Sequence, residues 1–206
     1  MRCPLLKKRE IKIFDVYVWS IVCLGVFLLG TNIPVFDSSR QAAEIFFLGM
    51  LVYFGESVSV PFPKGKGTAS VATPIIFTVA VLYGPAIGIW VAALATLRKR
   101  DLSGEVPVTI VLFNRGMLAV CAWMFSRIYI GVYGSSGALE FPQGLFAFIL
   151  AATGYTLLNA TIIGQALAIQ MRESFVTIWH RNIVWMLPNM FALFPLGALM
   201  VLVTQQ

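Results

Sequence analysis

Apolar runs long enough to cross the hydrocarbon core of a membrane recur along almost the whole chain. A crossing helix needs roughly 20 residues at a rise of 1.5 Å each. The runs are continuous blocks of Leu, Val, Ile, Phe and Ala, which favours helices over the alternating segments of a β-barrel. Of 206 residues, 59% are hydrophobic and 12% are charged, whereas a soluble domain is about 25% charged. We therefore predict an all-α, polytopic transmembrane helical bundle that forms one integral membrane domain over residues 1–206.

The sequence predicts six to seven membrane spans. The expected segments are Val16–Ile33, Ala42–Val60, Ser70–Tyr83, Pro85–Leu97, Thr109–Val132, Gly144–Gln170 and Ile183–Val203. The third and fourth segments are joined at Gly84-Pro85. Because proline removes a backbone donor and clashes with the preceding turn, this block is either one long kinked helix or a hairpin of two short helices.

The distribution of Lys and Arg favours the hairpin. If there are seven segments and the N-terminus lies inside, most of the basic residues fall on the inner side: Arg2, Lys7, Lys8, Arg9, Lys12, Lys64, Lys66, Arg98, Lys99, Arg100, Arg172 and Arg181. Cytoplasmic loops carry such an excess of positive charge. We therefore expect a bacterial inner (cytoplasmic) membrane protein with a basic cytoplasmic N-terminus over residues 1–14 and the C-terminus outside. The net charge of +6 is then a topology signal and predicts no nucleic-acid partner.

Five polar residues within the second and fifth segments are candidates for a buried network or ligand site: Glu44, Glu56, Asn114, Arg115 and Arg127. Insertion of a charged group at the centre of a membrane helix costs on the order of 2.5 to 3.5 kcal/mol. We therefore expect each charged residue to have a partner of opposite charge. Similar depths predict two ion pairs, one between Glu56 and Arg115 and one between Glu44 and Arg127. The alternative is that these residues only reach the membrane interfaces or lock helix packing.

A second set of candidates lies in the sixth and seventh segments. Tyr155 and Asn159 are one turn apart on one helix face, and Gln165 follows. Asn189 follows Pro188, where the last segment is expected to break, with a further break at Pro195. Such groups either bind a solute near the middle of the membrane or make ordinary interhelical hydrogen bonds and packing kinks.

The sequence contains no recognisable catalytic motif. His180 is the only histidine, and neither a His-Glu-x-x-His nor a Gly-x-Ser-x-Gly pattern occurs. The three cysteines are scattered, which makes a metal site or disulfide framework unexpected. The loop from Pro61 to Gly67 contains two lysines and two glycines but does not match a P-loop; it is either a stiff turn or a contact for lipid phosphate. We expect no enzyme activity, no cofactor and no metal.

Several short stretches occur in the same order as in a known membrane module. These are Glu56-Ser57-Val58-Ser59-Val60-Pro61-Phe62-Pro63-Lys64-Gly65, Leu82-Tyr83-Gly84-Pro85, Leu112-Phe113-Asn114, Leu157-Leu158-Asn159, Leu187-Pro188-Asn189 and Pro195-Leu196-Gly197. Together they resemble the amino-terminal membrane region of bacterial HD-GYP phosphodiesterases and related cyclic di-GMP signalling proteins. The resemblance implies a sensory or ligand-binding module. It carries over no phosphodiesterase activity, because no residues match the catalytic motif.

A second resemblance supplies an alternative. Leu82-Tyr83-Gly84-Pro85-Ala86-Ile87-Gly88 is similar to a segment of the substrate-capturing subunits of energy-coupling-factor transporters. That resemblance implies capture of a vitamin or metal ion as substrate, although the Ala-x-x-x-Ala pattern of their first helix is not evident in Val16–Ile33. A scaffold or assembly protein is the third alternative. The partners expected are membrane lipid, an unknown small ligand, and other membrane proteins or further copies of the chain.

Overall fold

The computed structural model describes residues 4–57, 60–61, 68–69, 71–98, 101, 103–184 and 187–206. Its helices are α1 (Pro4–Thr31), α2 (Ser39–Ser57), α3 (Ala72–Leu94), α5 (Val108–Tyr133), α6 (Gln143–Met171), α7 (Phe175–Ile178), the π-helix η1 (Trp179–Ile183), α8 (Leu187–Phe191) and α9 (Phe194–Thr204). Within these ranges, the only extended pairing is a two-residue antiparallel ladder of β1 (Val60–Pro61) with β2 (Thr68–Ala69). The predicted all-α class is therefore confirmed.

Four helical stretches are long and apolar enough to cross a membrane: Ile13–Thr31, Ala72–Leu94, Val108–Tyr133 and Gln143–Met171. This supports a multi-pass membrane protein. α2 has 19 residues but carries Arg40, Glu44 and Glu56, and it lies outside that set. Six to seven crossings remain a prediction.

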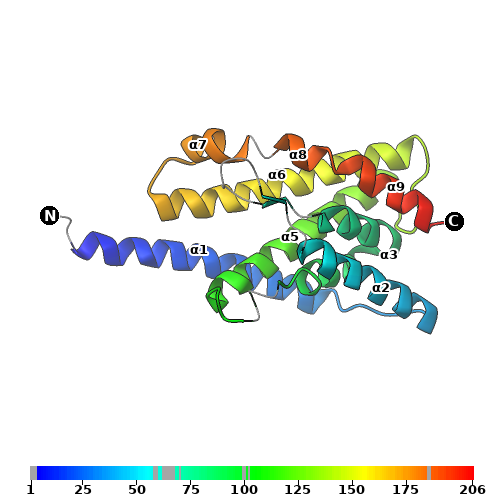
Figure 1. Cartoon of the computed structure of the whole chain (residues 1–206), viewed down its shortest axis with the longest axis horizontal. Helices are drawn as coiled ribbons and strands as arrows, with labels where there is room; N and C mark the ends of the chain where they lie inside the picture. The colour runs from blue at the N-terminus through cyan, green and yellow to red at the C-terminus, as the bar shows by residue number, and fades with distance from the viewer. Residues whose placement is uncertain are drawn as a thin grey trace.

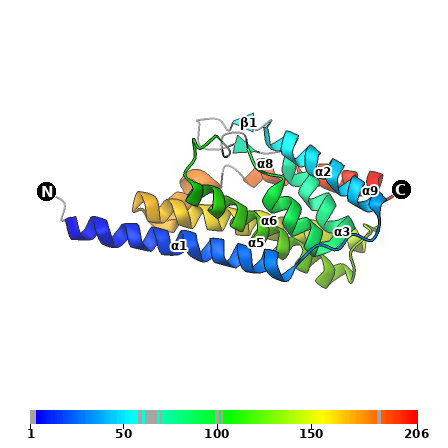
Figure 2. The same ribbon diagram turned by 90° about the horizontal axis from the view of Figure 1, so that it is seen from below.

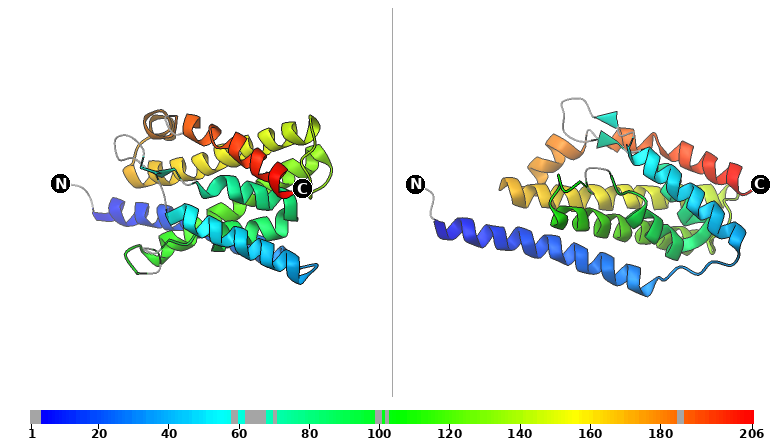
Figure 3. Two further views of the ribbon diagram at one scale, coloured as in Figure 1. Left: turned by 45° about the vertical axis from the view of Figure 1, so that its right-hand side comes forward. Right: turned by 60° about the horizontal axis from the view of Figure 1, so that its bottom comes forward.

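The helices pack side by side with alternating direction, and the two ends of the chain lie at opposite ends of the bundle (Figure 1). α1 runs along one edge, where Figures 2 and 3 show it extending beyond the other helices at its N-terminal end. We call the end of the bundle that holds the α6–α7 connection the inner end, and the end that holds the α5–α6 connection the outer end. These names follow the orientation expected from the basic connectors.

α3 reverses direction at Gly84, and this decides between the kinked helix and the hairpin. Gly84 has φ +78° and ψ −176°, a conformation that glycine adopts and other residues avoid. A Cβ built on Gly88 would lie 2.9 Å from Cα of Ala80, so residues four positions either side of Gly84 touch. In a straight helix those two residues would be about 12 Å apart along the axis. The hairpin of two short arms, joined at Gly84-Pro85, is correct.

The tip of the hairpin reaches the connector between α5 and α6. The N–H of Gly137 donates to the carbonyl oxygen of Val81 over 2.8 Å. A Cβ on Gly84 would lie 3.2 Å from Oγ of Ser136. At the other end of the arms, a Cβ on Gly55 of α2 would lie 3.3 Å from the backbone nitrogen of Ala72. The first arm therefore extends from the end of α2 to the outer connector.

The last predicted span, Ile183–Val203, is broken. Its residues are divided among the end of η1, α8 and α9. The interruptions do not occur at the prolines themselves, because Pro188 and Pro195 each stand second in their helix, α8 and α9 respectively. Proline fits the first turn of a helix because its missing N–H has no intrahelical partner there. α9 is an apolar helix of 11 residues, too short to cross about 30 Å of hydrocarbon alone.

An aromatic core holds α3, α5, α6 and α9 together. Phe77 stacks on Phe125 with centroids 4.6 Å apart, and it meets Phe148 and Tyr155 edge-on at 5.9 and 5.0 Å. Phe194 of α9 completes the ring contacts at 6.1 Å. Phe77 is fully buried, as expected for the central ring of a packed core.

α1 approaches α5 through two glycines. A Cβ on Gly25 would come within 2.3 Å of Cα of Gly116, and a Cβ on Gly116 within 2.8 Å of the carbonyl oxygen of Ile21. Small residues permit such close backbone contact between membrane helices. The other face of α1 is open, since Val16 and Phe27 are 66% and 63% exposed.

Candidate functional site

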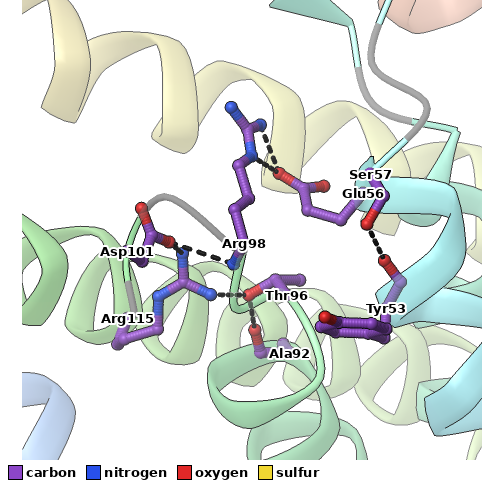
Figure 4. A network of polar contacts seen from close by, with 8 residues as sticks. All are labelled: Tyr53, Glu56, Ser57, Ala92, Thr96, Arg98, Asp101 and Arg115. Carbon is purple, nitrogen blue, oxygen red and sulfur yellow. Dashed lines mark hydrogen bonds and ion pairs between the residues drawn. The ribbon is translucent and has the colours of Figure 1, made fainter. Parts of the chain in front are cut away.

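Four charged side chains gather where the second arm of α3 leads into α5 (Figure 4). They come from three elements: Glu56 from the last turn of α2, Arg98 and Asp101 from the connector after α3, and Arg115 from α5. We call these four residues the charged cluster. It stands at the base of the α3 hairpin, opposite the Gly84 tip.

The first ion pair joins α2 to the connector. Nε of Arg98 donates to Oε1 of Glu56 over 2.7 Å, and Nη2 donates to the same oxygen. The Glu56 side chain is 9% exposed and that of Arg98 is 22% exposed. Nη1 of Arg98 makes no hydrogen bond with any residue that the structure describes.

The second ion pair joins the connector to α5. Nη2 of Arg115 lies 3.3 Å from Oδ2 of Asp101, and Nη1 donates to Oγ1 of Thr96. Oδ2 of Asp101 also accepts the backbone N–H of Arg98 over 3.2 Å, while the N–H of Asp101 donates to the Arg98 carbonyl oxygen over 2.9 Å. Thr96 in turn donates to the Ala92 carbonyl oxygen over 2.7 Å. Asp101 thus fixes the turn and the arginine together.

The charged cluster lies within the apolar length of the bundle. Arg115 follows the start of α5 at Val108 by seven residues, or about 10 Å at 1.5 Å per residue. Its neighbour Gly116 packs against Ile21 and Val22, which lie midway along the apolar stretch Ile13–Thr31 of α1. The side chains of Arg115 and Asp101 are 13% and 5% exposed. The surrounding helices therefore shield most of each charged side chain from solvent.

The expected ion pair between Glu56 and Arg115 is wrong, because each residue pairs with a different side chain. The structure brings both residues into one cluster, and Glu56 is near enough to exert a Coulombic attraction on Arg115. However, each residue takes its direct partner from the connector, Arg98 for Glu56 and Asp101 for Arg115. The distribution of basic residues alone predicts an ordinary inner loop for this connector. The sequence feature that indicates its role is Asp101, an acidic residue directly after Arg98-Lys99-Arg100 and shortly beyond the end of α3.

The expected pairing of Glu44 with Arg127 is also wrong. Glu44 accepts from Nε of Arg40 over 2.9 Å and from the hydroxyl of Tyr83 over 3.1 Å. Arg127 points out of the bundle and is exposed. The spacing of Arg40 and Glu44, one helical turn apart, is the signal that identifies the true pair.

The candidates on α6 do not form one continuous polar stripe. Tyr155 is 1% exposed and belongs to the aromatic core. Thr156 is fully buried, and neither its Oγ1 nor Oδ1 of Asn159 has a hydrogen-bond partner among the described residues. Thr153 and Thr161 face outward and donate back to their own helix, which satisfies a hydroxyl next to lipid.

The remaining candidates, Asn114, Gln165 and Asn189, have no hydrogen bond or ion pair with the charged cluster in the described part of the structure. Asn114 and Gln165 are half-buried, and their side chains make no hydrogen bond with a described residue. The backbone of Asn189 lies in α8, but its side chain is outside the described part of the structure. The loop 62–67 and residues 58–59, which carry part of the family resemblance, are also outside it.

An apolar groove of about 420 Å³ lies beside the charged cluster, between α2 and the second arm of α3. Its lining includes Pro34, Phe36, Gly49, Tyr53, Trp90 and Leu94. The indole N–H of Trp90 donates to the Asn32 carbonyl oxygen over 2.9 Å and ties the α1–α2 connector across the outer end of the groove. This volume is within the range of about 300–1,000 Å³ that is usual for ligand pockets.

Comparison with protein-family models, curated proteins and solved structures finds no match for this chain. In the described residues, no group of three or more His, Cys, Asp or Glu side chains is arranged to hold a metal ion.

Proposed function

We propose that this chain is a non-enzymatic, multi-pass module of a bacterial inner membrane that binds a small ligand or lipid and serves a sensory role. In this proposal the N-terminus is cytoplasmic, the C-terminus is outside, and the arms of α3 count among six to seven passes. The module is of the kind that precedes cyclic di-GMP output domains, as the ordered sequence resemblance implies.

The charged cluster carries this proposal. A buried ion pair gains little stability over apolar side chains of similar volume, because desolvation offsets most of the Coulombic attraction. Ionisable residues inside a membrane bundle are therefore a functional-site hypothesis in their own right. Here two arginine–carboxylate pairs stand beside an apolar groove, at the base of a hairpin that other helices hold in place.

Thermal unfolding in detergent or nanodiscs, with panels of lipids and metabolites, tests the proposal. A ligand at about 100 times its Kd adds about 2.7 kcal/mol, which in a chain of this size raises Tm by about 5 °C or more. We expect at least one compound to do so in the wild type and to fail in the double variant Glu56→Gln/Arg98→Gln.

The matched control is the double variant Arg40→Gln/Glu44→Gln, which removes an ion pair from the outer end of α2, where the side chains are 89% and 44% exposed. It should keep the full ligand shift. A panel that moves no Tm, or a shift that survives removal of the Glu56–Arg98 pair, overturns the proposal. Co-purification with an ATPase complex, together with solute uptake by cells, would instead identify the transporter subunit.

A further inference from the structure

We propose that the groove between α2 and the second arm of α3 binds one acyl chain of an anionic phospholipid whose phosphate contacts Arg98. This inference rests on the proposed function and names the ligand of the same site. It commits to a lipid of the leaflet on the side of the basic connectors.

The groove has an apolar body and a charged end. Along α2, the lining residues Gly49 and Tyr53 are followed one turn later by Glu56. Along the second arm of α3, Trp90 and Leu94 are followed by Arg98, four residues beyond Leu94. Residues three or four apart share one face of a helix. On α2, the face that lines the groove therefore continues to Glu56 of the charged cluster. On α3, the chain reaches Arg98 of the cluster soon after the helix ends.

The opposite end of the groove is apolar. Pro34 and Phe36, from the connector between α1 and α2, line it there, and the Trp90–Asn32 hydrogen bond holds that connector in place. A molecule with a long apolar tail and a polar head therefore fits in one direction only. The tail end meets Pro34 and Phe36, and the head lies at the Arg98 end.

The side of the groove is open to the surroundings of the bundle. Phe46 of α2 is 71% exposed and Leu94 of α3 is 54% exposed, so apolar side chains border the opening. A lipid chain can enter sideways from the membrane without crossing the bundle. A polar soluble metabolite would meet an almost entirely apolar lining.

Arg98 supplies the charge complementarity. Its Nε and Nη2 are held by Glu56, while Nη1 has no partner among the described residues and the side chain is 22% exposed. A guanidinium fixed in this way suits the oxygens of a phosphate group. Lys99 and Arg100 follow directly in the sequence, and basic residues near the inner leaflet attract anionic head groups.

Delipidated full-length protein in detergent provides the test, with Kd measured by native mass spectrometry and Tm by thermal unfolding. The probes are phosphatidylglycerol, phosphatidylcholine with the same acyl chains, and inorganic phosphate. We expect phosphatidylglycerol to bind at least about tenfold more tightly than phosphatidylcholine, a difference of about 1.4 kcal/mol. Inorganic phosphate alone should give no shift, because it lacks the chain that fills the groove.

Two leucine variants separate the groove from general effects on folding. Gly49→Leu fills the groove, and a Cβ there meets only Ala95 at 4.0 Å, so the variant should fold but bind phosphatidylglycerol at least about tenfold more weakly. Gly131→Leu places the same side chain on an open position of α5, where a Cβ meets nothing within 4 Å. Its affinity should stay within about twofold of the wild type.

Arg98→Lys keeps the positive charge but loses the planar guanidinium group. The affinity of this variant for phosphatidylglycerol relative to phosphatidylcholine should be measurably lower than that of the wild type. Its Tm without lipid should change little. Equal affinity for the two lipids or unchanged binding by Gly49→Leu would each overturn the inference. A non-lipid compound whose Tm shift depends on Glu56 and Arg98 would overturn it too, yet would leave the proposed function standing. The absence of any shift would remove both.

Discussion

The aromatic core around Phe77 and the charged cluster around Arg98 lie in the same bundle and follow opposite physical rules. In the core, five aromatic rings from four helices pack without charge, and every contact adds dispersion energy. In the cluster, four ions neutralise one another pairwise, and desolvation offsets most of the gain. The core stabilises the packing of the helices. The cluster contributes little stability, but its ion pairs specify which residues come together at the base of the hairpin.

Removal of the central ring is the largest perturbation that we expect. Phe77→Ala should lower the free energy of unfolding by about 3–5 kcal/mol, the range for a phenylalanine truncated in a packed core. Denaturant unfolding in micelles measures it. The control is Phe27→Ala on the open face of α1, where the side chain is 63% exposed, and the change should be below about 1 kcal/mol. Equal effects at the two positions would contradict the dense core.

Loss of one carboxylate from the charged cluster comes next. Asp101→Asn leaves the buried Arg115 without its counter-ion and should cost about 3 kcal/mol, measured in the same unfolding assay. Glu105→Gln is the control, since Glu105 lies in the same connector but is exposed. An Asp101→Asn variant as stable as the control would show that the pair is immaterial to the fold.

The partner assignment within the cluster is measurable by double-mutant cycles. Glu56→Gln combined with Arg98→Gln should show a coupling energy of about 1–2 kcal/mol, and Glu56→Gln combined with Arg115→Gln a smaller one, because only the first two side chains are in contact. The free energies of unfolding of the wild type, the three single variants and the two double variants give both coupling energies. A larger coupling to Arg115 would restore the pairing expected from the sequence.

The smallest effect concerns Arg127. Because this side chain is exposed and lies outside both the core and the cluster, Arg127→Gln should change the free energy of unfolding by less than about 0.5 kcal/mol. A loss of more than about 1 kcal/mol would mean that Arg127 has a partner in the membrane-embedded protein.

Much of the fold follows from the sequence, because hydrophobic runs and punctuation by Gly and Pro are local signals. The helices α1, α5 and α6 begin and end within a few residues of the predicted segments, apart from the basic extension of α1 to Pro4. Gly84-Pro85 was located correctly as the turn between two short arms. The α8–α9 region was less well predicted, because prolines mark the first turn of a helix as readily as its end.

The site was predicted only in outline. Burial inside a span identified Glu56 and Arg115, but their partners come from a connector whose depth depends on the length of the α3 arms. A positive-inside count assigns Arg98 to a loop outside the membrane, whereas a hairpin with short arms places it beside α2. Depth along the bundle is a tertiary property, and periodicity along the chain does not encode it.

The reversal of α3 at Gly84 also constrains the order of biogenesis. Its arms, of about 12 and 10 residues, are about 18 and 15 Å long, so neither spans a bilayer core of about 30 Å when it leaves the translocon. The groups that complete the hairpin are synthesised later: Arg115 takes Asp101, and the Gly137 N–H takes the Val81 carbonyl oxygen. These contacts of the hairpin can therefore form only after α5 and its outer connector have been translated.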